Sequence, residues 1–222
     1  MGRNIELTAA DGFKLGAYLA EPAAKPRGGI VLVQEIFGVN AHIRKVCDGY
    51  AADGYTVVAP AYFDRVQRGF DVGYSQADIE AGRAIVPKLN WDNIIKDTQA
   101  AREQIKSAGK SAVVGYCWGG TVAWLSAAKL NGLSCAVAFY GGGVAGMVNE
   151  QPRCPVMFHW GEKDHAIPLD AVRKVEAAHP SAVSFLYPAG HGFNCDERAS
   201  YEAGSSKLAR ERTLEFLKKH FG

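Results

Sequence analysis

A cysteine set between glycines is the first candidate for chemistry in this sequence. Residues 111–121, Ser-Ala-Val-Val-Gly-Tyr-Cys-Trp-Gly-Gly-Thr, run from a short apolar segment into a segment with helical character. A nucleophile with glycines two residues before and after it, between a strand and a helix, sits on a strained turn that exposes its side chain. Cys117, with Gly115 and Gly119, therefore predicts a cysteine nucleophile. A core cysteine in a glycine-rich turn is the alternative interpretation of this motif taken alone.

A carboxylate and a histidine follow the cysteine in the order that fits such a turn. Enzymes with their nucleophile on this kind of turn have the chain order nucleophile, acid, histidine. Asp164 follows an apolar segment in His-Trp-Gly-Glu-Lys-Asp, and His191 stands between two glycines in Tyr-Pro-Ala-Gly-His-Gly. Taken singly, each is equally well explained as a turn or surface residue. Together and in this order, Cys117, Asp164 and His191 predict a catalytic triad.

The remaining histidines show no metal-binding spacing. The sequence has no H-E-x-x-H motif, and we expect neither a metal ion nor a cofactor. His159 lies inside an apolar segment and is predicted to be a hydrogen-bonded core group. His42, His179 and His220 lie on helical segments or at their ends, where solvent is the expected partner. The glycines at 141–143 lack the lysine and threonine of a phosphate loop, so they predict a bend beside a pocket.

Short apolar segments alternate with helical ones and would position these residues. The apolar runs are rich in β-branched residues and do not alternate with polar ones, which is typical of strands covered on both faces in a parallel sheet. An Asp-Gly pair between two alternating runs in residues 4–22 predicts an antiparallel hairpin. The expected strands are 29–34, 55–60, 111–116, 135–141, 155–161 and 184–188, and the expected helices are 40–54, 90–109, 119–132 and 200–220.

This alternation predicts one α/β domain over residues 1–222, with a mostly parallel central sheet and helices on both faces. No repeat, low-complexity tract or linker divides the chain. In such a sheet Cys117, Asp164 and His191 would all follow the carboxyl ends of strands. Open α/β sheets keep their binding sites at that edge.

The composition and charge limit the binding partners and the cellular compartment that we expect for this protein. The chain has 222 residues and a net charge of +2, without a basic block, so neither nucleic acid nor a membrane surface is an expected partner. The N-terminal segment has no apolar core of an export signal. The five cysteines are scattered and never form C-x-x-C, which favours a reducing cytoplasm over a disulfide framework.

The motifs taken together resemble the dienelactone hydrolase (carboxymethylenebutenolidase) family of the α/β-hydrolase fold. The Gln-Glu-Ile-Phe-Gly string combined with a cysteine on the turn is far more specific than the turn alone, because most other α/β-hydrolases carry serine there. The resemblance runs nearly end to end, in the family's order, through VLVQEIFGVNAHIR, GYTVVAPAYF, GYCWGG, FYGGG, GEKDHAIP, YPAGHGFNCDER and RTLEFL.

The resemblance implies a carboxylic ester hydrolase that opens a lactone ring. It assigns Cys117 as the nucleophile, His191 as the base and Asp164 as the carboxylate that orients the base. It also gives Glu35 a role as the hydrogen-bond partner of the resting thiol, which would turn to the histidine when substrate binds. The apolar neighbours of Glu35 in sequence predict a partly desolvated carboxylate.

Further site residues follow from the same resemblance. The backbone amides of Ile36 and Trp118 would form the oxyanion hole. The substrate would be a small lactone or activated ester, anionic in character, and the chain would be a monomer or a weak homodimer. The family binds a substrate carboxylate with two arginines, but here Cys195 stands where one of them is expected. The candidates for substrate binding are Arg83, Arg198, Tyr140, Phe37 and Tyr62.

Two other classes of function stay open from the sequence. A thiol-based redox sensor would use Cys117, with Cys195 as the candidate resolving cysteine. A non-catalytic binding protein on the same fold would be expected to lose at least one member of the predicted triad, and all three are present.

Overall fold

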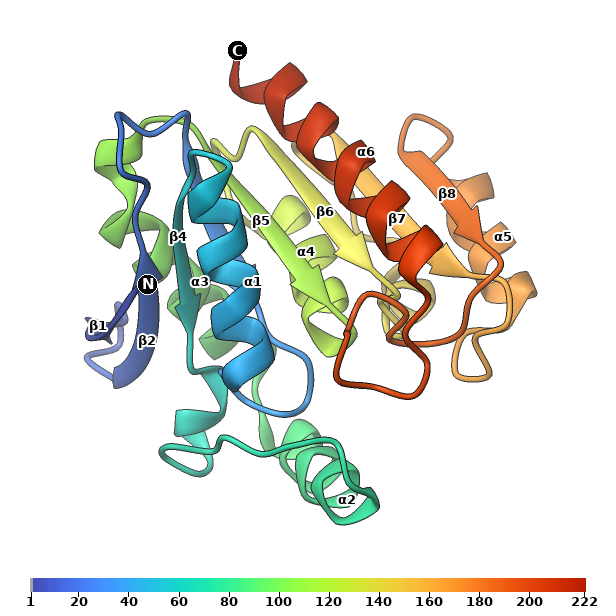
Figure 1. Ribbon diagram of the computed structural model, residues 1–222, viewed down its shortest axis with the longest axis horizontal. Helices are drawn as coiled ribbons and strands as arrows, with labels where there is room; N and C mark the ends of the chain where they lie inside the picture. The colour runs from blue at the N-terminus through green and yellow to red at the C-terminus, as the bar shows by residue number, and fades with distance from the viewer. Residues whose placement is uncertain (1) are drawn as a thin grey trace. The chain divides into compact units, whose positions relative to one another are not determined.

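The structure, a computed structural model, describes residues 2–222. The chain divides between Ser111 and Ala112 into two compact units, which are described in turn. In each unit, helices cover both faces of a set of paired strands, which is the arrangement of the α/β fold class predicted above (Figure 1).

In the first unit an antiparallel hairpin leads into parallel strands. The hairpin turns at Asp11 and Gly12, where Gly12 has a φ of +81° that suits glycine, and it confirms the prediction for residues 4–22. The second hairpin strand pairs antiparallel with β4 (Thr56–Pro60), and β4 pairs parallel with β3 (Gly29–Val33). Every residue of β3 and β4 is buried. The strands are β1 (Arg3–Thr8), β2 (Lys14–Ala20), β3 (Gly29–Val33) and β4 (Thr56–Pro60), in the order β1-β2-β4-β3.

The helices of the first unit begin at polar caps. Helices α1 (Ala41–Ala52) and α3 (Trp91–Gln104) were predicted, and Figure 1 shows them on opposite sides of β4. The side chains of Asn40 and Asn90 accept hydrogen bonds from the first turns of these helices. Helix α2 (Gln76–Ile85) was not predicted. Short 3-10 segments span η1 (Tyr62–Arg65), η2 (Val86–Lys88) and η3 (Lys106–Ala108).

The second unit consists of parallel strands in simple chain order. Because these strands are parallel, their carboxyl ends meet at one edge. The loops after β5 (Ser111–Tyr116), β7 (Val156–Gly161) and β8 (Val183–Tyr187) leave from that edge. Figure 1 shows α6 (Ala203–Phe221) and α4 (Trp118–Lys129) on opposite faces of β6. The other elements are β5 (Ser111–Tyr116), β6 (Cys135–Phe139), β7 (Val156–Gly161), β8 (Val183–Tyr187), α5 (Leu169–Ala178) and η4 (Val144–Met147).

Two histidine predictions were wrong. His42 and His179 are buried and do not face solvent. His179 Nε2 contacts the carbonyl oxygen of Val148 at 2.7 Å, and its ring packs edge-on against Trp124. A helix end that packs against a loop therefore buries a histidine that spacing alone places at the surface.

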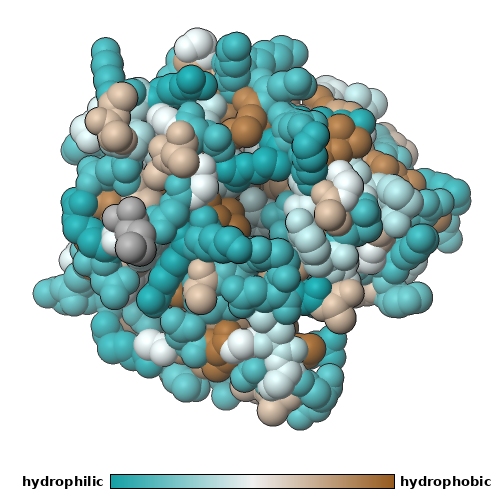
Figure 2. Space-filling model, in the orientation of Figure 1, coloured by the Kyte–Doolittle hydropathy of each residue, from teal (hydrophilic) through white to brown (hydrophobic). Residues whose placement is uncertain are grey.

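The surface carries scattered apolar side chains. Figure 2 shows hydrophilic residues over most of the visible face, with hydrophobic residues in separate small areas. Within residues 2–222, no helix has the length and apolar character needed to cross a membrane. The large apolar side chains exposed in the described chain are Trp91, Leu186, Tyr201 and Leu208.

Candidate active site

Cys117 lies on a strained turn between β5 and α4. It is the N-cap residue of α4, with φ 57° and ψ −117°, a backbone conformation that costs energy for a residue with a side chain. A Cβ added at Gly115 would overlap the carbonyl oxygen of Gly119, so the strand and the helix approach closely only because position 115 is glycine. The Cys117 amide donates to Phe139 O at 3.0 Å. The predicted elbow and the role of its first glycine are confirmed.

Asp164 is held by the turn that follows β7. One carboxylate oxygen accepts hydrogen bonds from the amides of Ala166 at 2.8 Å and Ile167 at 3.2 Å. The other accepts from Nδ1 of His191 at 2.7 Å. The side chain of Asp164 has no exposed surface. These contacts fix the carboxylate in one orientation before any substrate is present.

His191 joins the carboxylate to the sulfur. Its Nε2 lies 3.0 Å from Sγ of Cys117, and its side chain is 20% exposed. Cys117 is also partly exposed. The three residues that the sequence predicted as a triad, 27 and 74 positions apart, are therefore in one chain of contacts.

Backbone pairing beyond β7 and β8 brings the two loops together. The amide of Glu162 donates to Tyr187 O at 2.7 Å, and the amide of Lys163 donates to Ala189 O at 2.9 Å. A Cβ at Gly161 would lie 2.5 Å from the carbonyl oxygen of Ala189. Gly161 was not among the predicted site residues, although a glycine directly after an apolar strand is a signal for close backbone approach.

Two opposing effects act on the imidazole of His191. Burial opposes its charged form, but the negative charge of Cys117 and the hydrogen bond and charge of Asp164 favour it more strongly. The net result raises the pKa of His191 from 6.5 to about 10. Because Sγ of Cys117 and the Asp164 carboxylate lie on the two sides of the ring, the protonated imidazolium of His191 is favoured at neutral pH.

Arg198 lies against the turn that carries His191. Gly192 has a φ of +77°, and a Cβ added there would overlap the Nη1 atom of Arg198. The amide of Arg198 donates to Cys195 O at 3.1 Å, which folds the segment back toward the histidine. The guanidinium therefore occupies space that a side chain at position 192 would fill, one residue from His191.

Tyr140 directly follows β6 and packs on the same histidine. Its ring centroid lies 5.1 Å from that of His191 at an interplanar angle of 59°. The side chain is fully buried. Of the predicted substrate-binding residues, Tyr140 and Arg198 thus lie beside His191.

The residues predicted around the first strand–helix loop lie in the first unit. Glu35 is 1% exposed, so its predicted desolvation is confirmed. Phe37 is buried and packs edge-on against Tyr74, with ring centroids 4.6 Å apart. A Cβ at Gly82 of α2 would overlap the carbonyl oxygen of Ile36. Helix α2, which the sequence did not predict, therefore packs directly on the loop that carries the Ile36 amide.

Two other predicted substrate-binding residues lie in different surroundings. The side chain of Arg83 is exposed on α2 and has no hydrogen-bond or ion-pair partner within residues 2–222. Tyr62 is fully buried, its hydroxyl lies 2.9 Å from Oγ1 of Thr98, and burial raises its pKa. Tyr62 is therefore a packed core residue, which differs from its predicted place on a pocket wall.

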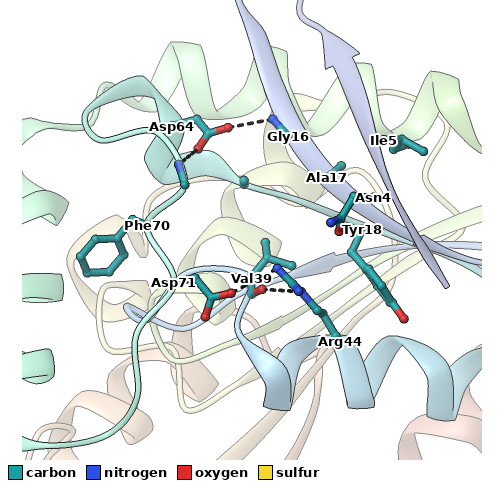
Figure 3. A pocket seen from close by; sticks show the side chains of 12 residues that line it. Asn4, Ile5, Gly16, Ala17, Tyr18, Val39, Arg44, Asp64, Phe70 and Asp71 are labelled. Carbon is teal, nitrogen blue, oxygen red and sulfur yellow. Dashed lines mark hydrogen bonds and ion pairs between the residues drawn. The ribbon is translucent and has the colours of Figure 1, made fainter. Parts of the chain in front are cut away.

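A cavity of about 270 Å³ lies in the first unit beside the hairpin (Figure 3). Its charged groups pair with one another and with the backbone. Arg44 contacts Asp71 at 3.1 Å and donates to Val39 O at 2.9 Å, and Asp64 accepts from the amides of Gly16 and Gly69 at 2.8 Å each. No pattern in the sequence indicated this cavity, and its polar groups serve the local fold.

A strand, a tight turn bearing the candidate nucleophile, a helix, and an acid and a histidine on later loops define an α/β hydrolase. The chain belongs to the dienelactone hydrolase family, whose model matches residues 15–221. It is 33% identical to a carboxymethylenebutenolidase of Pseudomonas putida, over 96% of this chain and 94% of that protein. The protein is accordingly an ester or lactone hydrolase.

Comparison with solved structures also identifies an α/β-hydrolase fold. A Klebsiella pneumoniae protein named a putative dienelactone hydrolase superposes with a TM-score of 0.83 at 30% identity, covering 98% of both chains. An esterase of Pyrococcus furiosus superposes with a TM-score of 0.74 at 16% identity, covering 100% of this chain and 93% of that one, which supports the fold alone.

Proposed function

We propose that the protein opens the lactone ring of dienelactone-type substrates, or of related activated esters, with Cys117 as the nucleophile. The observation that carries this proposal is the contact chain from Sγ of Cys117 through His191 to the Asp164 carboxylate. The carboxymethylenebutenolidase relatives supply the substrate class. The presence of all three side chains, in contact, favours catalysis over a binding role.

In the first step the thiolate of Cys117 attacks the lactone carbonyl. The S–C bond forms while the carbonyl electron pair moves to oxygen. The positive end of α4, which begins at Trp118, favours negative charge at this point. The amides of Trp118 and Ile36 are the proposed donors to the oxyanion, and one such donor is worth about 3 kcal/mol in other acyl-transfer enzymes.

Ring opening then uses the proton on His191. The tetrahedral intermediate collapses, the bond from the carbonyl carbon to the ring oxygen breaks, and the imidazolium protonates the departing enolate. The sulfur is now an uncharged thioester. Because the charge of Cys117 is the first of the contributions that raise the pKa of His191, that pKa falls on acylation. Neutral His191 can then take a proton from water, whose hydroxide attacks the thioester and releases Cys117.

Glu35 is the proposed partner of the thiol in the resting enzyme. Glu35 is buried, and a buried carboxylate is stable only among hydrogen-bonding or charged partners, of which the thiol would be one. The structure shows the sulfur 3.0 Å from the imidazole. In the family that the sequence resembles, the thiol contacts the histidine in the reactive state and the glutamate in the resting state. The contact with His191 would therefore be the reactive one, and a contact with Glu35 would replace it at rest.

The substrate carboxylate has a proposed anchor in Arg198. Its guanidinium lies against Gly192, next to His191, so an anionic group held there would be close to the reacting centre. Arg83 on α2 is the second candidate, since it has no competing partner in the described chain. Phe37 and Tyr140 are the proposed aromatic residues that pack behind the pocket surface, since both side chains are buried.

The experiment compares turnover of cis- and trans-dienelactone with that of a neutral aryl ester, for wild type and Cys117→Ala. We expect faster turnover of the anionic lactones, loss of all turnover in the variant, and thermal unfolding within a few degrees of wild type. Mass spectrometry should detect an acyl adduct at Cys117. Turnover that survives in Cys117→Ala would overturn the nucleophile assignment. Sulfenic acid at Cys117 after peroxide, without ester turnover, would favour the redox alternative.

A further inference from the structure

Two residues other than glycine have a positive φ in the described chain, and both are at the candidate site. They are Cys117, with φ 57°, and Tyr140, with φ 38°. Residues with a side chain rarely adopt this conformation, and strain of this kind concentrates where function requires a particular geometry. The elbow explains the strain at Cys117. The strain at Tyr140 needs a separate explanation.

The backbone around Tyr140 is held in place from both sides. Its amide donates to His159 O at 2.8 Å, which extends the pairing of β6 with β7 by one residue. The chain then turns at Gly141, where an added Cβ would lie 2.9 Å from the carbonyl carbon of Gly120 and 3.0 Å from the nitrogen of Thr121. The chain thus bends at Tyr140 between a paired strand and a crowded glycine.

The consequence of this bend is the position of the Tyr140 ring. The ring packs on His191 at 5.1 Å and, edge-on, on Phe193 at 5.3 Å, so it contacts the histidine loop at two residues. The side chain is fully buried. A residue that continued β6 without strain would direct its side chain differently, because successive strand residues point to opposite faces.

We propose that Tyr140 is a positioning residue that holds the imidazole of His191 in the one orientation that joins Cys117 to Asp164. This inference rests on the proposed function and deepens it. Both ring nitrogens of His191 have partners, at 2.7 and 3.0 Å, and rotation of the ring breaks both contacts together. A packed aromatic ring restricts that rotation. The charged groups beside His191 are Cys117 and Asp164, which contact its ring, and Arg198, whose guanidinium lies against Gly192.

The test uses Tyr140→Leu, Tyr140→Phe and the matched control Phe139→Leu. Phe139, the last residue of β6, is equally buried. It packs on Tyr116, Tyr140, His159 and Phe193 but makes no ring contact with His191 within residues 2–222. Two quantities are measured for each folded protein. One is kcat and KM for an aryl ester. The other is the rate at which iodoacetamide alkylates Cys117, followed by mass spectrometry from pH 5 to 10.

We expect Tyr140→Leu to lower kcat by about 10- to 100-fold with little change in KM, as for other misplaced catalytic groups. Its alkylation profile should shift to higher pH. Tyr140→Phe should recover most of both losses, and Phe139→Leu should lower thermal stability while leaving the profile in place. A change in KM alone, or equal losses in the Phe and Leu variants, would overturn the positioning role.

The alkylation readout separates this inference from the proposed function. It requires no substrate, so a shifted profile in Tyr140→Leu supports positioning even if no lactone is hydrolysed. An unshifted profile in a protein that does hydrolyse the lactones rejects the role of Tyr140 alone.

Discussion

Two histidines in residues 112–222 have similar surroundings but differ in charge: the ring of His159 is neutral and that of His191 is protonated. The rings of His159 and His191 both lie among aromatic side chains, and both use their two nitrogens for contacts at 2.7–3.0 Å. Burial nevertheless lowers the pKa of His159 to about 3, whereas the charges around His191 raise its pKa to about 10. The partners, and not burial alone, decide which ring carries a proton.

The proton directions around His159 explain why it stays neutral. The hydroxyl of Thr213 donates to Ala209 O at 2.8 Å, so its oxygen can accept from Nε2 of His159. Nδ1 is then the acceptor, and the Tyr187 hydroxyl donates to it at 2.8 Å. A second proton on this ring would require the Tyr187 hydroxyl to become the acceptor, and burial together with the charge of Arg212 opposes that charged form. At His191 both partners are acceptors, so a second proton is favoured.

An arginine near each histidine extends the comparison. Arg212 packs over Phe185 at 3.9 Å and adds to the lowering of the pKa of His159. Arg198 lies beside Gly192 at the other site. The first is a packed cation near a neutral ring, and the second is a proposed anchor near a charged one.

The largest expected effect comes from exchanging each histidine for glutamine. His191→Gln should lower kcat/KM by on the order of 10³-fold or more, because it removes the group that moves the proton. His159→Gln should lower the melting temperature, since it disrupts a buried hydrogen-bond chain, while the folded enzyme keeps its kcat. Steady-state kinetics and thermal unfolding of both variants check this. A mere tenfold loss in His191→Gln would mean that another base acts.

Replacing the two arginines should show the same contrast, with activity affected at one site and stability at the other, but the effects should be smaller than those of the histidine variants. Arg198→Gln is expected to raise KM for an anionic lactone by about 10- to 100-fold, the value of one charge-assisted hydrogen bond, and to leave a neutral ester unaffected. Arg212→Gln should leave both KM values in place and reduce stability through lost packing. Equal KM values for the anionic lactone in wild type and Arg198→Gln would remove Arg198 from the site.

The pH dependence of stability should have opposite signs at the two sites. A histidine in the unfolded chain has a pKa of about 6.5. The raised pKa of His191 gives stabilisation that is complete below about 6.5 and lost as pH rises toward about 10. The lowered pKa of His159 gives stabilisation that is lost as pH falls from about 6.5 toward about 3.

Two variants test which histidine causes the loss of stability at alkaline pH and which causes the loss at acid pH. Cys117→Ala should flatten the alkaline fall in melting temperature, and His159→Gln should flatten the acid fall. Differential scanning calorimetry from pH 4 to 10 measures both. An alkaline limb that is unchanged in Cys117→Ala would show that the sulfur does not stabilise the imidazolium.

The smallest expected effect comes from removing the Tyr187 hydroxyl, which hydrogen-bonds the neutral ring of His159. Tyr187→Phe removes the donor to Nδ1 of His159 and should cost about 1 kcal/mol of unfolding free energy. Turnover should stay at the wild-type level, since Tyr187 does not contact His191 through its hydroxyl in the described chain. Denaturant unfolding checks the cost, and a loss of turnover would show that the two sites are coupled.

The sequence predicted much of the fold because its signals are local. Buried parallel strands are continuous apolar runs, and the glycine two residues before Cys117 is required by one tight turn. Helices α2 and α5 were not predicted, because few of their residues are buried and no long apolar stripe marks them. The elbow and the order of the site residues could therefore be predicted directly from the amino acids.

The tertiary structure decided the charge states and the environment of each residue. Cys117, Asp164 and His191 are far apart in the chain, and their contacts depend on parallel strands ending at one edge. The burial of His42 and His179, the core position of Tyr62 and the place of Arg198 against Gly192 also depend on packing between distant segments. A pKa depends on the charges and solvent within a few ångströms of a group, and only the folded chain determines those neighbours.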